Sequence, residues 1–188
     1  GTNMVGGNTI SYVAHTGYLD IKNDTGKNLA RVFFTYYKKA GDAADKRPIT
    51  FAFNGGPGSS SVWLHMGALG PKRVQLQNDG TATPPPYNII DNEYSWLNKS
   101  DMVFIDPVAT GYSRPAPGES PKQFHGYVED IQSVGNFIRS FLSKYERWGS
   151  PKFLAGESYG TTRASGLAKF LQDSYRIYIN GIFLISPV

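Results

Sequence analysis

The chain has 188 residues, of which 40% are hydrophobic and 14% aromatic, so it is long and apolar enough to bury a core as one globular domain. Its formal charge is only +4, and its basic residues are scattered in pairs, which argues against nucleic-acid and membrane binding. The absence of cysteine excludes a disulfide framework, a thiol nucleophile and thiolate metal ligands.

Two further patterns concern membranes and export. No stretch reaches the run of about 18 apolar residues that a membrane-spanning helix needs. Residues 1–21 lack the charged-then-apolar plan of a signal peptide. Because maturation removes such a signal, the sequence leaves the cellular compartment open.

The first half of the chain predicts two strands and two irregular loops. Residues 31–37 are aromatic and β-branched, and the polar turn 41–48 separates them from a second strand at 49–53. These two strands are expected to form an antiparallel hairpin. A Gly/Ser loop at 54–61 follows, and the Pro-rich stretch 81–87 is expected to be a surface connection.

The second half of the chain alternates strands and helices. Short apolar runs at residues 102–105, 153–155 and 181–188 predict buried strands. Apolar residues recur every three or four positions from 127 to 145, which predicts an amphipathic helix, and a second helical pattern runs through 164–171. This alternation is typical of a parallel α/β sheet, so we expect the α/β fold class.

Gly156-Glu157-Ser158-Tyr159-Gly160 matches the nucleophile elbow, a sharp turn between strand and helix that lifts a serine hydroxyl above the edge of a sheet. Side chains at the two glycine positions would crowd the turn, and Ser158 would lie at a helix N-terminus, which favours developing negative charge. The pentapeptide alone could arise by chance in a glycine-rich chain. The predicted strand before it and helix after it favour the functional interpretation.

A second glycine-rich loop, residues 54–58 with the sequence Asn-Gly-Gly-Pro-Gly, also follows a predicted strand. It is similar to the oxyanion loops of hydrolases, which supply a backbone N–H to the tetrahedral intermediate. The alternative is a plain Gly/Pro turn. Two such loops, each at a strand end, fit one hydrolase active site better than two coincidences.

Three segments together carry a specific resemblance: FNGGPGSSS at 53–61, DPVATGYS at 106–113 and GESYG at 156–160. In sequence, order and spacing they resemble the serine carboxypeptidase family, over a range from about residue 17 to 188. The resemblance implies an α/β-hydrolase fold with a mostly parallel sheet and an N-terminal antiparallel hairpin. Residues 1–188 would be the N-terminal part of one such domain, without the C-terminal strands and cap.

The resemblance also implies roles for six residues. Ser158 would be the acylated nucleophile, and the backbone N–H groups of Gly56 and Tyr159 would form the oxyanion hole. The terminal carboxylate of a peptide substrate would be held by Asn54, Gly55 and Glu157. No metal ion or organic cofactor is implied.

Glu157 would face the substrate carboxylate, and two ionised carboxylates would repel each other. Binding is therefore expected when Glu157 carries a proton shared with Asn54 or with the substrate, which predicts peptidase activity favoured at acidic pH. The alternative is that Glu157 only stabilises the dipole of the following helix.

Two positions depart from the family pattern. Ala52 stands where a tryptophan is common, two residues before Asn54, so one wall of the carboxylate pocket is expected to differ. Ser59 replaces the cysteine usual in eukaryotic members, which suggests a bacterial-type branch without disulfides.

The third departure concerns the catalytic triad. In α/β-hydrolases the acid and the histidine follow the serine along the chain, yet His15, His65 and His125 all precede Ser158. We expect His65 and His125 to be solvated polar residues. Asp173 is expected to be an exposed helix carboxylate outside the triad.

These observations predict a serine carboxypeptidase present here as a fragment that lacks the triad acid and histidine. One alternative is an esterase or acyltransferase on the same scaffold. Another is a non-catalytic chain, either truncated or one that binds its own C-terminal half, in which case the last strand and the elbow helix would expose apolar surface. The family resemblance favours a secreted or periplasmic location.

Overall fold

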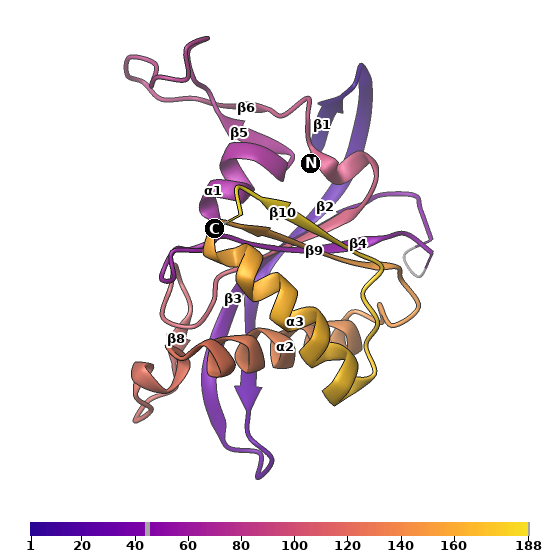
Figure 1. Ribbon diagram of the computed structural model, residues 1–188. Helices are drawn as coiled ribbons and strands as arrows, with labels where there is room; N and C mark the ends of the chain where they lie inside the picture. The colour runs from indigo at the N-terminus through magenta and orange to yellow at the C-terminus, as the bar shows by residue number, and fades with distance from the viewer. Residues whose placement is uncertain (44–45, 188) are drawn as a thin grey trace.

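The computed structural model describes residues 1–43 and 46–187 of the chain, and Figure 1 shows its elements in colour from the N- to the C-terminus. The strands are β1 (Thr2–Val5), β2 (Asn8–Lys22), β3 (Asn28–Lys39), β4 (Ile49–Phe53), β5 (Lys72–Val74), β6 (Ile89–Asp91), β7 (Asp101–Ile105), β8 (Arg114–Pro115), β9 (Lys152–Glu157) and β10 (Gly181–Ile185). The helical segments are α1 (Val62–Leu64), η1 (His65–Leu69), η2 (Trp96–Asn98), η3 (Pro121–Phe124), α2 (Tyr127–Lys144) and α3 (Tyr159–Tyr175).

The main sheet has the strand order β1-β2-β3-β7-β4-β9-β10, and β8 pairs with β3 outside this path. The strands β7, β4, β9 and β10 are parallel to one another. The strands β1, β2 and β3 are antiparallel, as is the junction between β3 and β7. The predicted combination of a parallel α/β sheet with an antiparallel N-terminal hairpin is therefore confirmed.

The prediction that the strands at 31–37 and 49–53 pair with each other was wrong. The strand at 31–37 belongs to β3, which pairs with β2 and β7, whereas β4 pairs in parallel with β7 and β9. All five residues of β4 are buried, which suits a central strand of a parallel sheet better than one half of a hairpin. Residues 44 and 45 of the predicted turn, and residue 188 of the predicted last strand, lie outside the described residues.

Alternate residues of the central strands face two separate cores. On one side, Phe51 and Phe53 of β4 and Leu154 of β9 pack with the apolar face of α2 and α3. On the other side, Ala52 of β4 and Ala155 of β9 pack with residues of α1 and η1. Figure 1 shows α2 and α3 together on one side of the sheet and α1 on the other. Because side chains alternate along a strand, every second residue of β4 and β9 faces the elbow helix α3.

The predicted helices agree with α2 and α3, and β7 and β9 agree with two of the predicted strands. The prediction that the last strand is buried was wrong, because β10 leaves three apolar side chains exposed: Ile182, Phe183 and Leu184. The leucines of α3 are fully buried, so the apolar exposure expected under the non-catalytic alternative is found on the strand, whereas the leucines of the elbow helix show none. Within residues 1–43 and 46–187, no helix combines the length and apolar character needed to cross a membrane.

Candidate active site

Ser158 occupies a sharp turn between β9 and α3, with φ of 55° and ψ of −127°, a conformation that is strained for a residue with a side chain. Two interactions hold it there. Its N–H donates to the carbonyl oxygen of Ile185 at 3.0 Å, and its own carbonyl accepts from the backbone N–H and the hydroxyl of Thr161 at 2.9 and 2.7 Å. The strained turn is thus tied to both β10 and the first turn of α3.

The glycines on either side of Ser158 have the steric role that the sequence predicts. A Cβ on Gly156 would collide with the carbonyl oxygen of Gly160, and a Cβ on Gly160 would lie 2.8 Å from the carbonyl oxygen of Phe53. Only a chain without side chains at both positions can make this turn against the end of β4.

Gly55 brings the second glycine-rich loop directly against the elbow. A Cβ built on Gly55 would lie 2.5 Å from the Tyr159 nitrogen and 2.7 Å from both the Glu157 oxygen and the Gly160 nitrogen. The backbones of the two loops are therefore in contact, although they are about a hundred residues apart in the chain. The N–H of Tyr159 lies at the N-terminus of α3, where the first N–H groups have no partner within the helix.

The direction of the Gly56 N–H is set within its own loop. The N–H of Ser59 donates to the Gly55 carbonyl at 3.1 Å, and the Gly56 N–H lies in the same planar peptide, pointing away from that carbonyl oxygen. Gly56 itself has φ of +109°, which strongly favours glycine. This loop therefore holds one backbone donor in a fixed direction beside the elbow.

Asn54 and Glu157 form a hydrogen-bonded pair next to Ser158. The Asn54 amide donates through Nδ2 to Oε2 of Glu157 at 3.0 Å, and its Oδ1 accepts from the N–H of Leu64 at 2.9 Å. In this orientation the amide presents its Nδ2, an N–H donor, to Glu157 and its oxygen to Leu64. Ala52 is fully buried in the core on the α1 side of the sheet.

Asp106 joins the DPVATGYS segment to the glycine-rich loop. Its Oδ1 accepts from the N–H of Ser61 at 2.9 Å and its Oδ2 from that of Tyr112 at 3.1 Å. Burial raises the pKa of this carboxyl above its usual value, and the two N–H donors act in the opposite direction. A Cβ on Gly111 would collide with the carboxylate, so this motif is built around one buried acid. Sequence reasoning used the motif for recognition but missed this role.

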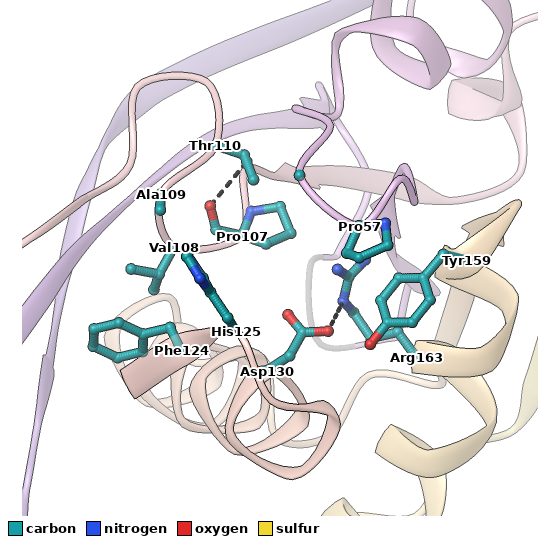
Figure 2. Close-up of a pocket in the computed structure, with 11 residues that line it drawn as sticks. Pro57, Pro107, Val108, Ala109, Thr110, Phe124, His125, Asp130, Tyr159 and Arg163 are labelled. Atoms are coloured by element: carbon teal, nitrogen blue, oxygen red, sulfur yellow. Dashed lines mark hydrogen bonds and ion pairs between the residues drawn. The ribbon is translucent and has the colours of Figure 1, made fainter. Parts of the chain in front are cut away.

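A cavity of about 300 Å³ lies beside the elbow, and Figure 2 shows the residues around it. Its floor carries an ion pair, in which Nε of Arg163 donates to Oδ2 of Asp130 at 2.7 Å. Burial, followed by the charge of Asp130, raises the pKa of the neighbouring Tyr159. Its lining residues are Pro57, Gly58, Pro107, Val108, Ala109, Thr110, Phe124, His125, Asp130, Tyr159 and Arg163.

Sequence reasoning missed this ion pair, yet it left a signal. Asp130 falls on the apolar stripe of α2 beside Ile131, and Arg163 falls on the buried face of α3 beside Ala164. An acid and a base on the apolar faces of consecutive helices are rarely buried unless they are paired.

The three histidines lie in different surroundings. His15 is on β2, stacked on Tyr36, and His125 is exposed at the edge of the cavity, as expected for a polar loop residue. The expectation that His65 is solvated was wrong. It is partly buried, stacks on Phe104 and is hydrogen-bonded through Nε2 to the Tyr37 hydroxyl at 2.7 Å.

Burial of His65, which results from the packing of η1 against the sheet, lowers its pKa to about 4. Asp173 is exposed and paired with Lys169 on the outer face of α3, as predicted. Within the described ranges, no three His, Asp or Glu side chains gather closely enough to ligate a metal ion.

Comparison with known proteins addresses the family. The family model described as serine carboxypeptidase matches residues 6–185. The chain belongs to the serine carboxypeptidase family. It is 27% identical over 172 residues to serine carboxypeptidase-like 33 of Arabidopsis thaliana, covering 90% of this chain and 34% of that protein. It is 31% identical over 160 residues to a carboxypeptidase Y homolog of Arthroderma benhamiae, covering 83% and 29%.

Solved structures agree on the fold. Kex1(delta)p, a prohormone-processing carboxypeptidase from Saccharomyces cerevisiae, matches with a TM-score of 0.68 and 22% identity, covering 91% of this chain and 38% of the other. LAE6, an α/β hydrolase from the metagenome of Lake Arreo, matches with a TM-score of 0.50 and 15% identity, covering 93% and 44%. The α/β-hydrolase fold is thereby shown. The chain spans about a third of the length of the curated relatives it matches.

Proposed function

We propose that this chain carries the nucleophile and the substrate-carboxylate site of a serine carboxypeptidase, which removes the last residue from peptides. The observation that supports this most is the Asn54–Glu157 pair, because it sets hydrogen-bonding groups for a carboxylate one residue away from Ser158. A peptide whose terminal carboxylate lies on this pair would bring its last amide carbonyl towards the serine hydroxyl.

In the proposed reaction, Oγ of Ser158 attacks the last amide carbonyl while a histidine accepts the serine proton. The N–H groups of Gly56 and Tyr159 stabilise the resulting oxyanion. The carbon–nitrogen bond then breaks, the departing amine takes the proton, and water hydrolyses the acyl-enzyme. Because all three histidines precede Ser158, we place the base and its acid outside these 188 residues.

Carboxylate binding depends on the proton that Glu157 is proposed to carry. The Asn54 amide presents its Nδ2 donor to Glu157, so the substrate carboxylate is the acceptor proposed for the proton of Glu157. This arrangement would bind free C-terminal carboxylates best at acidic pH, because two ionised carboxylates repel each other.

The variant Glu157→Gln tests this proposal because it keeps a neutral, hydrogen-bonding side chain at all pH values. Activity on N-blocked dipeptides is measured from pH 4 to 8, with free and amidated C-termini, in the naturally expressed polypeptide. The expected result is a flattened dependence of kcat/KM on pH above the wild-type optimum, with Ser158→Ala inactive at every pH. An unchanged pH profile and an unchanged preference for free carboxylates would leave Glu157 as a helix-end charge only.

An esterase or acyltransferase on the same scaffold is the second candidate, favoured by one observation. Ala52 is fully buried on the α1 side of the sheet, where the family commonly has tryptophan, so one wall of the proposed carboxylate pocket would differ. Hydrolysis of a blocked dipeptide, hydrolysis of the matching ester and acyl transfer to an added alcohol distinguish the candidates. A peptidase cleaves the free-acid dipeptide efficiently, whereas the alternative acts on the ester or transfers the acyl group.

The exposed face of β10 supports a proposal about partners. Phe183 lies 4.7 Å, between ring centroids, from Trp96, in an apolar groove that also contains Phe153. We propose that this face is covered by the C-terminal half of the enzyme, either in the same chain or as a second one. We also propose a secreted or periplasmic location, which cell fractionation with an antibody to this chain would test.

A further inference from the structure

We infer that Arg163, held by Asp130, is a positioning residue that fixes the oxyanion loop against the nucleophile elbow. The inference rests on the proposed function and concerns a side chain to which neither the family pattern nor the reaction gives a role. Arg163 lies on α3, five residues after Ser158, and its side chain is 1% exposed.

The guanidinium of Arg163 connects three elements. Its Nε donates to the Asp130 carboxylate on α2 at 2.7 Å, and its Nη1 donates to the backbone carbonyl of Asn54 at 2.8 Å. The planar group also lies between two rings, 5.3 Å from the centroid of Phe53 and 5.2 Å from that of Tyr159. These are the residues directly before Asn54 and directly after Ser158, so one side chain contacts both loops of the site.

The contact with Asn54 has a geometric consequence for the donor at Gly56. The peptide that joins Asn54 to Gly55 is planar, so holding its carbonyl fixes the direction in which the chain enters the loop. The next peptide is fixed by the bond from Ser59 to the Gly55 carbonyl. Without the hold of Arg163, the loop could rotate about Asn54 and carry the Gly56 N–H away from the oxyanion position.

Holding the Asp130 carboxylate and the Asn54 carbonyl at the same time requires an arginine. Two donors in a rigid plane reach the carboxylate and the carbonyl at once, whereas the single ammonium of lysine offers one point charge on a flexible stem. Asp130 is itself nearly buried, so its charge holds the guanidinium in one orientation.

The chain contains a matched control at the other end of the sheet. Arg147 is equally buried, pairs with Asp101 at 2.7 Å and donates to the backbone carbonyl of Arg47 at 2.9 Å. It therefore shares its exposure and these two kinds of partner with Arg163, and it also donates to the hydroxyls of Ser150 and Tyr36. Arg47 precedes β4 and Asp101 begins β7, so these contacts lie at the N-terminal ends of the strands. Asn54 and Ser158 instead follow the C-terminal ends of β4 and β9.

The experiment compares Arg163→Lys with Arg147→Lys in the naturally expressed polypeptide. Thermal unfolding is expected to show a loss of stability in both, at least as large in Arg147→Lys because Arg147 has more hydrogen-bond partners. In Arg163→Lys, kcat on a blocked dipeptide is expected to fall about 10- to 100-fold, while KM changes less than about three-fold. Complete removal of an oxyanion donor lowers kcat about 10²- to 10³-fold, and a displaced donor should lose part of that effect. In Arg147→Lys, kcat is expected to stay within about two-fold of the wild-type value, because no oxyanion donor is displaced.

Amide hydrogen exchange supplies a readout that does not need activity. Exchange in segment 54–59 is expected to rise about ten-fold or more in Arg163→Lys and to stay unchanged in Arg147→Lys. If Arg163→Lys does not fold, Asp130→Asn, which keeps the shape and one acceptor, is expected to change kcat and exchange in the same direction by less.

The outcomes separate the two proposals. If Arg163→Lys and Asp130→Asn leave kcat and loop exchange no different from Arg147→Lys, the positioning role is overturned. If the wild-type protein hydrolyses no peptide but Arg163→Lys selectively loosens segment 54–59, the positioning role stands and the carboxypeptidase proposal fails.

Discussion

Gly55→Ala tests whether close contact between the two glycine-rich loops sets the oxyanion hole. Its Cβ would lie 2.5 Å from the Tyr159 nitrogen, where ordinary contact begins at 3.4 Å, so the loop must retreat by the difference, about 1 Å. A displacement of about this size at a reacting group can lower a rate about 10²-fold. Loss of one oxyanion donor corresponds to about 2.7–4 kcal/mol of transition-state stabilisation. We therefore expect kcat to fall about 10²-fold.

The assay measures kcat and KM on an N-blocked dipeptide together with the melting temperature. Gly17→Ala is the matched control, because a Cβ at Gly17 would have no neighbour within 4 Å. The control should keep both kcat and KM. Gly55→Ala should lose kcat and also raise KM, because Gly55 is among the residues expected to hold the substrate carboxylate. A folded Gly55→Ala protein with kcat within about three-fold of the wild type would refute the reasoning, since a retained donor loses none of that stabilisation.

Two further predictions concern pH and the exposed strand. The folded pKa of His65, about 4, lies below its ordinary 6.5, so the unfolded chain takes up a proton as pH falls through this range and the folded chain does not. The contribution of neutral His65 to stability should therefore be complete above pH 6.5 and be lost towards pH 4. Urea unfolding should show wild type losing about 2 kcal/mol more than the neutral variant His65→Gln between pH 7.5 and 4.5. Equal losses would contradict the assignment. Phe183→Asp should reduce self-association of the 188-residue chain, measured by sedimentation. Tyr87→Asp, on an exposed loop, should not reduce it. A wild-type chain that is monomeric at high concentration would argue against an uncovered β10 face.

The sequence predicted the elements whose signal is local. The strand, elbow and helix around Ser158 follow from glycine spacing and apolar periodicity, and the structure has them as β9 and α3. The long strand β2 was missed because the middle of its length is exposed and its alternation is broken around Gly17. The hairpin was misassigned because β7 enters the sheet between β3 and β4 from about fifty residues further along the chain, and no local pattern encodes that.

The site shows the same division between local and distant information. The positions of Ser158, Gly156 and Gly160 could be predicted because their spacing is a local pattern, although the steric constraint on Gly160 comes from the distant carbonyl oxygen of Phe53. The contacts of Arg163 with Asp130 and Asn54 join residues far apart in sequence, so only the packed structure reveals them. The roles of Gly56, Tyr159 and Glu157 remain predictions that await kinetic tests.

The central claim is that Ser158 is the acylated nucleophile, and covalent labelling tests it most directly. The naturally expressed polypeptide is treated with a fluorophosphonate, digested and examined by mass spectrometry, with and without a competing peptide. The account predicts a single adduct on the peptide that contains Ser158, protected by the competitor and absent from Ser158→Ala. An unlabelled Ser158, or an adduct on another serine that persists in Ser158→Ala, would contradict it.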